Sequence, residues 1–261
     1  MKTLLGLLLL SLCGFGQATE FRVCADNRGI APYVYMDGVG IAQYLAVHAA
    51  ENLKLQLRLE YHPQPRCMAE LAHDRYDALL IASPNPAMDQ VVGFPKDAQG
   101  APDQRFSYGH YRVVAFKLRD SSVDWNGRHF TGLDRPLLYQ SGVPTVELVV
   151  SKLEGQNLAS ARTPQSMIDM MRLGRASAGI VMEPLLLNAL REQGREKEFV
   201  VLEPALLESN AYMAMSKHLL QRNPQLANRV WEEIRRIRSA PHWPLLFEQA
   251  LAKRLSIDSV P

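Results

Sequence analysis

A helix–turn–strand unit occurs twice in this 261-residue chain, at an offset of 100 residues, and this repeat constrains the fold most. Residues 68–81 align with residues 168–181, so that Arg75 meets Arg175. Each copy combines an amphipathic helical pattern, a tight turn and a short apolar run typical of a buried strand. Chance could produce such a match because helix–turn–strand units are common. Two similar α/β lobes would produce it directly.

The first hundred residues alternate between strand and helix patterns. Strand patterns occupy residues 21–26, 55–61 and 76–82, and helical patterns occupy residues 41–52 and 65–72. The second strand alternates apolar and polar residues, and the third is almost wholly apolar, which is typical of a buried strand. The order β-α-β-α-β predicts a mainly parallel sheet covered by helices, which is an α/β fold.

Other segments of the chain give weaker signals for strands and helices. Strands are expected at residues 111–118, 137–139, 199–202 and 211–215, and a short strand is expected at 33–35. A helix is expected to run to about residue 153 with Thr145 as its cap. Asn223 followed by Pro224 predicts the start of another helix, because Asn caps helices and Pro suits the first turn.

Residues 1–18 have the order of a secretory signal peptide. Lys2 supplies the basic start, residues 3–12 are apolar, and Gly16 and Ala18 precede a cleavage site before Thr19. The apolar run is about half of the ~20 residues that a membrane-spanning helix needs. We therefore expect export to the periplasm and a mature chain of 243 residues. The alternative is a lipoprotein anchored at Cys13, although Leu12 stands where lipidation signals carry a small residue.

Two cysteines, Cys24 and Cys67, remain after removal of the signal peptide. In an oxidising compartment such a pair is expected to form a disulfide, and two separate buried thiols are the alternative. The formal net charge of the whole chain is only +2, and its Lys and Arg residues are dispersed. This pattern argues against nucleic acid as a partner.

Motifs of catalysis and cofactor binding are missing from the sequence. The seven histidines form no metal-binding pair, no serine-nucleophile motif occurs, and no glycine-rich phosphate loop follows a strand. We therefore expect no cofactor, no metal and no enzymatic activity.

The order of short motifs resembles the bacterial extracellular solute-binding proteins of family 3, which are type II periplasmic binding proteins that serve polar amino acid ABC transporters. The likeness covers about 230 residues, and Cys24 with Arg66–Cys67 resembles a Cys-paired subgroup. The stretches that carry it are Val23-Cys-Ala-Asp26, Pro32-Tyr-Val-Tyr35, Pro65-Arg-Cys67, Tyr76-Asp-Ala78, Gly93-Phe-Pro95, Trp125-Asn-Gly127, Leu173-Gly-Arg175, Tyr212-Met-Ala-Met-Ser216 and Trp231.

This resemblance implies a two-lobed Venus-flytrap. Lobe one is expected to contain residues 19–110 and 208–261, and lobe two residues 111–207, with two crossings as the hinge. A small polar ligand, an amino acid or an amine, would bind between the lobes, and an inner-membrane permease complex would take it from a monomeric receptor. The alternatives are a sensing or scaffolding module of the same fold, and a periplasmic dehydratase-like enzyme with Glu183 or Asp26 as its acid.

Two positions depart from the family's amino-acid grip. Met88 falls near the place of the arginine that holds the ligand carboxylate, and Met182 takes the place of the aspartate that holds the amine. Methionine cannot replace a bidentate arginine–carboxylate pair.

Four candidate ligand residues lie in the first third of the chain. By the resemblance, Asp26 points at the cleft, although it could simply cap a turn. Tyr33 and Tyr35 could stack on or hydrogen-bond a ligand, with one of them expected in the core. Arg66 begins a helix, where a cation gains nothing from the helix dipole, so it is expected to meet a ligand or a loop carboxylate.

Five further candidates follow the later strands. Ser83 and Asn85 could contact a ligand or form a turn. Gly142 and Thr145 precede a helix, whose backbone N–H groups could bind an anion, although capping also explains Thr145. Glu183 could pair with a ligand cation or start a helix facing solvent.

Overall fold

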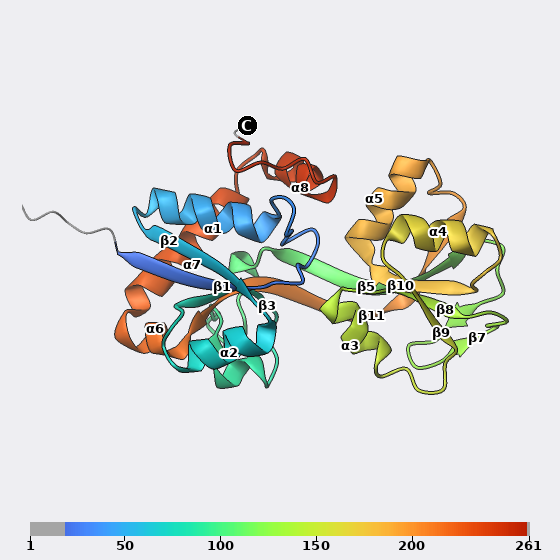
Figure 1. The fold of residues 1–261 in the computed structure, drawn as a ribbon, viewed down its shortest axis with the longest axis horizontal. Helices are drawn as coiled ribbons and strands as arrows, with labels where there is room; N and C mark the ends of the chain where they lie inside the picture. Colours follow the sequence, from blue (N-terminus) through green and yellow to red (C-terminus); the bar gives the residue numbers. More distant parts are fainter. Residues whose placement is uncertain (1–18, 260–261) are drawn as a thin grey trace, which may run out of the picture.

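The computed structural model describes residues 19–259, so the predicted signal peptide and Cys13 lie outside the described residues. Two lobes lie side by side and are connected by two long strands, as Figure 1 shows. These strands are β5 (Gly109–Leu118) and β11 (Phe199–Ser216). They pair antiparallel from Phe199 opposite Leu118 to Ala211 opposite Gly109, with a register shift between Leu202 and Leu207.

Lobe one is built on the N-terminal strands and the C-terminal helices. Its elements are β1 (Glu20–Asp26), α1 (Ile41–Asn52), β2 (Gln56–His62), α2 (Gln64–Ala72), β3 (Ala78–Ala82), η1 (Met88–Gln90), β4 (Val92–Gly93), η2 (Gln104–Phe106), α6 (Lys217–Arg222), α7 (Pro224–Arg238) and α8 (Trp243–Leu251).

Lobe two is built on the middle of the chain. Its elements are β6 (Asp124–Trp125), β7 (Phe130–Thr131), β8 (Leu137–Gln140), α3 (Pro144–Val150), β9 (Leu158–Ala161), α4 (Pro164–Arg172), β10 (Ala178–Met182) and α5 (Glu183–Gln193).

The two lobes have equivalent strand orders. In the sheet order β2-β1-β3-β11-β5-β10-β8-β9, counting inward from each end makes β2 equivalent to β9, β1 to β8 and β3 to β10. In each lobe the outer three strands are parallel and the crossing strand is antiparallel to them. Helices cover both faces, and their apolar sides form the core. The predicted α/β class is therefore confirmed.

The sequence repeat coincides with equivalent elements. Helix α2 and strand β3 begin at residues 64 and 78, and α4 and β10 begin at residues 164 and 178. Both copies close their turn with the same bond: the Arg75 N–H donates to Glu70 O at 2.9 Å, and the Arg175 N–H to Met170 O at 2.9 Å. The offset of 100 residues is therefore a structural repeat and not a coincidence.

Three sequence-based expectations are wrong in detail. The strands expected at 199–202 and 211–215 are parts of one strand, β11, because β5 pairs with residues 199–202 and 207–211 on the two sides of a register shift, and β3 and β4 pair with the end of the strand. Residues 33–35 form no strand; the N–H groups of Tyr33 and Val34 both donate to Ile30 O and close a turn. Thr145 is not a cap, because α3 begins at Pro144 with Val143 in the capping position.

The lobe boundaries predicted at residues 110 and 208 fall inside β5 and β11. The exact division of the chain stays a prediction. Among residues 19–259, no helix is long and apolar enough to cross a membrane.

Candidate functional site

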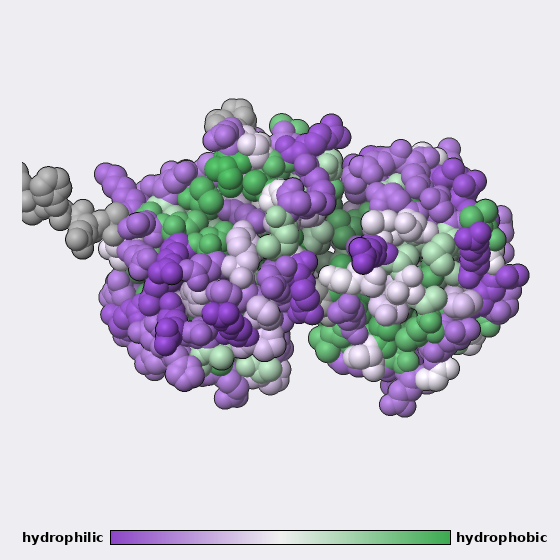
Figure 2. Space-filling model, in the orientation of Figure 1, coloured by the Kyte–Doolittle hydropathy of each residue, from purple (hydrophilic) through white to green (hydrophobic). Residues whose placement is uncertain are grey.

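A cleft of about 740 Å³ lies where the strand ends of the two lobes face each other. Figure 2 shows the gap between the two lobes, with hydrophobic residues over α3 at its edge. The walls are mostly apolar and also carry hydroxyl, amide and charged groups. These walls include Arg28, Tyr33, Ser83, Asn85, Met88, Tyr111, Thr145, Glu147, Leu148, Lys152, Met182 and Glu208.

The wall of lobe one is formed by the loop after β3. The Ser83 and Tyr111 hydroxyls are 2.7 Å apart, which ties this loop to the crossing strand β5. Asn85 folds the loop onto itself, because its Oδ1 accepts the backbone N–H groups of Ala87 and Met88. Both predicted residues line the cleft, and Asn85 also forms the turn that was its alternative role.

Tyr33 contributes a hydroxyl that lacks a hydrogen-bond partner among the described residues. The side chain is 1% exposed and lies edge-on to Tyr111, with ring centroids 6.3 Å apart. Burial raises the pKa of its phenol above the ordinary value, so the hydroxyl keeps its proton. An unpaired buried hydroxyl in a cleft wall is a group that a ligand can satisfy.

The wall of lobe two is formed by α3. Thr145 lines the cleft beside Glu147 and Leu148. The Gly142 N–H donates to Glu147 Oε1 at 2.9 Å, so a carboxylate of the protein already takes the backbone N–H group that we expected to bind an anion. Gly142 itself does not line this cleft. It lines a second cavity, which lies between the lobes on the side of α8.

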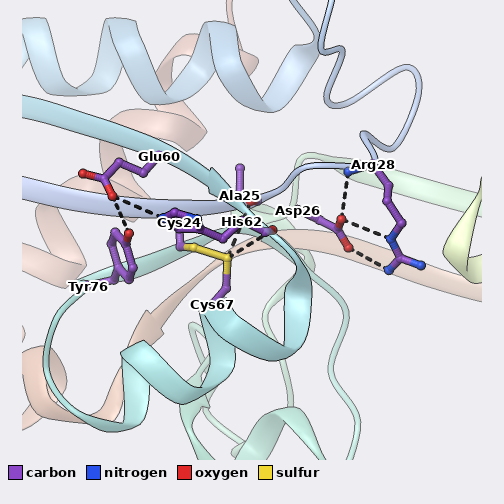
Figure 3. The surroundings of a disulfide bond; sticks show 8 residues. All are labelled: Cys24, Ala25, Asp26, Arg28, Glu60, His62, Cys67 and Tyr76. Atoms are coloured by element: carbon purple, nitrogen blue, oxygen red, sulfur yellow. Dashed lines mark hydrogen bonds and ion pairs between the residues drawn. A yellow bond between two sulfur atoms is a disulfide. The ribbon is translucent and has the colours of Figure 1, made fainter.

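Arg28 stands between the lobes, and sequence reasoning missed it. It holds Asp26 through two bonds, Nη2 to Oδ2 at 2.8 Å and Nε to Oδ1 at 3.2 Å, and this hydrogen bonding raises the pKa of Arg28. Its Nη1 is 4.0 Å from Glu147 Oε2 on the facing lobe. Asp26 is 5% exposed and is absent from the cleft wall, so its charge is used within lobe one. Figure 3 shows the Asp26–Arg28 pair at the end of β1.

Three other predicted residues lie away from the cleft. Arg66 is exposed and outside its wall. Tyr35 lines the second cavity, where Lys253 Nζ lies 4.9 Å from the ring centroid. Glu183 begins α5 and pairs with Arg112 Nη1 at 2.9 Å.

Arg112, at the centre of the crossing strands, is a second residue that sequence reasoning missed. Besides Glu183, it contacts Glu203 at 2.6 Å and Glu208 at 3.0 Å. Its side chain is 20% exposed, and the hydrogen bond to Glu203 is the largest cause of its raised pKa. One arginine is therefore shared by three carboxylates at the hinge, and of these three only Glu208 lines the cleft.

The predicted disulfide between Cys24 and Cys67 is confirmed. It joins β1 to α2 in the core of lobe one, two residues before Asp26, as Figure 3 shows. Within residues 19–259, no group of three or more His, Cys, Asp or Glu side chains is placed to hold a metal ion.

Solved structures resemble this chain in fold. An amino acid ABC transporter substrate-binding protein, AbpA from Streptococcus pneumoniae, bound to L-arginine, matches with a TM-score of 0.58 and 16% identity over 91% of this chain and 96% of that one. The ancestral amino acid-binding protein AncCDT-1, a precursor of cyclohexadienyl dehydratase, matches with a TM-score of 0.59 and 16% identity, covering 89% and 95%. A histidine kinase sensor domain with similarity to periplasmic binding proteins matches with a TM-score of 0.55 and 17% identity, covering 90% and 96%.

The fold is that of the two-lobed periplasmic binding proteins. No protein-family model matches the chain, and no curated protein matches it by sequence. Identity near 16% supports the fold and does not assign a ligand.

Proposed function

We propose that this protein is a periplasmic solute-binding protein that holds a small amine-bearing solute between its lobes and delivers it to an ABC-type importer. The single observation that carries this proposal is the 740 Å³ cleft at the facing strand ends of the two lobes, beside the paired strands β5 and β11. Paired crossing strands with few other connections suit a hinge, so a ligand that contacts both walls would favour the closed lobes.

The charges around the cleft favour a cationic ligand. Arg28 is already paired with Asp26, and Arg112 is outnumbered by three glutamates at the hinge. Glu147 and Glu208 both line the cleft, whereas Lys152 is exposed at its rim. An amine can form charge-assisted hydrogen bonds with these two carboxylates.

The apolar walls favour a ligand with a hydrocarbon body. Met88 and Met182 line the cleft from opposite lobes, and Leu148 presents a side chain that is 53% exposed. The two positions that would grip an α-amino acid therefore bring flexible apolar surface instead. Tyr33 adds one unpaired hydroxyl, which suits an amine that also carries a hydrogen-bonding group.

We further propose that the protein binds its ligand without transforming it. Asp26 and Glu183, the two acids proposed for a dehydratase-like reaction, are held by Arg28 and Arg112. A dehydratase needs an acid that reaches the substrate, and neither residue lines the cleft.

A thermal-shift screen of the oxidised protein against amines, amino acids, organic acids and sugars tests this function. An amine at 100 times its dissociation constant adds about 2.7 kcal/mol to the free energy of unfolding, which raises Tm by about 5 to 10 °C. A folded protein that no compound stabilises would contradict the receptor function and favour the sensing or scaffolding alternative.

We expect Glu147→Gln to weaken amine binding about tenfold, because the substitution removes a charge from the cleft wall and keeps the side chain's size. Titration calorimetry of both proteins with the best amine of the screen measures the change. Glu154→Gln is the matched control, since Glu154 is exposed outside the cleft wall. Equal affinities of the two variants would show that the carboxylate of Glu147 does not contact the ligand.

A further inference from the structure

A second cavity, of about 460 Å³, lies between the lobes on the side of α8, and we propose that it is a binding site for a small organic acid. Lobe one contributes the turn at Tyr35–Asp37, the last residue of α8, Leu251, and Lys253 two residues later. Lobe two contributes the end of β8, the start of α4 and one face of α5. Among the described residues, Arg28 alone lines both this second cavity and the main cleft.

Gln140 is the first observation that points to a ligand. It ends β8, lines the second cavity and is only 5% exposed, yet its Oε1 has no hydrogen-bond partner among the described residues. A buried polar atom left without a hydrogen-bond partner is destabilising, so such groups are few in folded proteins. Because an amide can present either its oxygen or its NH₂ group, Gln140 can donate a hydrogen bond to a carboxylate.

The equivalent residue of lobe one shows that this position suits a charged partner. Strand pairing places Asp26 opposite His62, and Gln140 opposite Ala161, at the ends of the equivalent strands β1 and β8. Asp26 has a cation from its own lobe, Arg28. Gln140 has no such partner in the described part of the chain, so its lobe leaves the corresponding position open for a group from outside.

The charged groups of this cavity favour an acid. Of the two carboxylates in its wall, Asp37 is paired with Lys253 at 3.1 Å, and Glu192 keeps its charge while it accepts hydrogen bonds from Asn188 at 3.0 Å and Gln165 at 3.2 Å. Arg162, which is exposed at the start of α4, has no carboxylate within ion-pair distance among residues 19–259. Its guanidinium can hold a carboxylate through two parallel bonds.

The start of α4 strengthens this preference. The helix has nine residues, and its N-terminal end carries partial positive charge beside Arg162. The second cavity thus combines an exposed arginine, an unpaired buried amide and a helix start, whereas the main cleft has two cationic and two carboxylate side chains in its wall, and one of the cations, Arg28, is already paired. The two cavities are expected to bind ligands of opposite charge.

Calorimetric titration of the oxidised protein with succinate tests the site. We expect saturable binding that is weakened at least tenfold by Arg162→Gln. The matched control is Arg128→Gln, which removes an exposed cation outside both cavities and is expected to leave succinate binding unchanged. Equal loss in both variants, or equally tight binding of sulfate, would reduce the effect to general attraction of anions and overturn the proposal.

Gln140→Met gives a second test in which stability and binding change in opposite directions. Methionine keeps the length of the side chain and removes the unpaired amide, so Tm is expected to stay the same or rise while succinate binding falls at least tenfold. A fall in Tm of several degrees would mean that the amide is already satisfied, and unchanged succinate binding would mean that it does not face the ligand. Either result would overturn the proposal, as would the absence of succinate binding to the unmodified protein.

Discussion

Replacing Cys24 and Cys67 together by alanine is expected to lower the free energy of unfolding by about 4 kcal/mol. The bridge spans a sequence separation of 43 residues and both cysteines are fully buried, so its removal frees a long loop of the unfolded chain. For a chain of this size such a loss lowers Tm by about 10 °C. Equilibrium denaturation with urea, with and without the disulfide, measures the difference.

A reductant provides the control for this prediction. Denaturation in the presence of a reductant is expected to lower the stability of the unmodified protein toward that of the double variant, which itself should not respond. A double variant within 1 kcal/mol of the unmodified protein would contradict the prediction and indicate that α2 is held to β1 by packing alone.

Arg112→Met is expected to destabilise the protein by about 2 kcal/mol, the second-largest effect. The substitution keeps the hydrocarbon stem and leaves Glu183, Glu203 and Glu208 without their shared cation. The loss is smaller than for a fully buried pair, because Glu203 and Glu208 are more than half exposed and water screens them. Urea denaturation at low and high salt measures it, and salt should reduce the deficit.

Arg128→Met is the matched control for Arg112, since Arg128 is an exposed arginine in a loop. It is expected to change stability by less than 0.5 kcal/mol. Equal stabilities of the two variants, or a deficit that does not respond to salt, would show that the three glutamates do not depend on Arg112.

Local patterns predicted much of the fold. Helix α1 begins and ends at the residues that the pattern indicated, and the repeat at 100 residues marked α2 with β3 and α4 with β10. These signals are local, because an apolar helix face or a run of buried strand residues can be recognised without knowing its partners. Strand β11 was divided in the prediction because Glu203, Pro204 and Glu208 interrupt its apolar pattern, and only the neighbouring strand β5 explains its continuity.

The candidate site was less predictable, because its properties depend on pairs of residues from different segments. The sequence leaves Asp26 open between the cleft and a turn cap, and nothing local indicates that the Arg28 side chain, two residues later, holds it. Glu183 was expected to face ligand or solvent, whereas Arg112, 71 residues away in the chain, binds it. Met88 and Met182 are the exception, since the resemblance to family 3 solute-binding proteins places them at the ligand-grip positions, and both line the cleft.

The central claim is that the cleft between the lobes prefers an amine with an apolar body, and three ligands of one skeleton test it most directly. Phenethylamine, phenylalanine and phenylacetate are titrated by calorimetry into the Arg162→Gln variant, in which acid binding to the second cavity is expected to be weakened at least tenfold. We expect phenethylamine to bind at least tenfold more tightly than either of the others, because the cleft offers Glu147 and Glu208 to the amine and no unpaired buried cation to a carboxylate. Tighter binding of phenylalanine or phenylacetate, or no binding of any of the three, would contradict the claim.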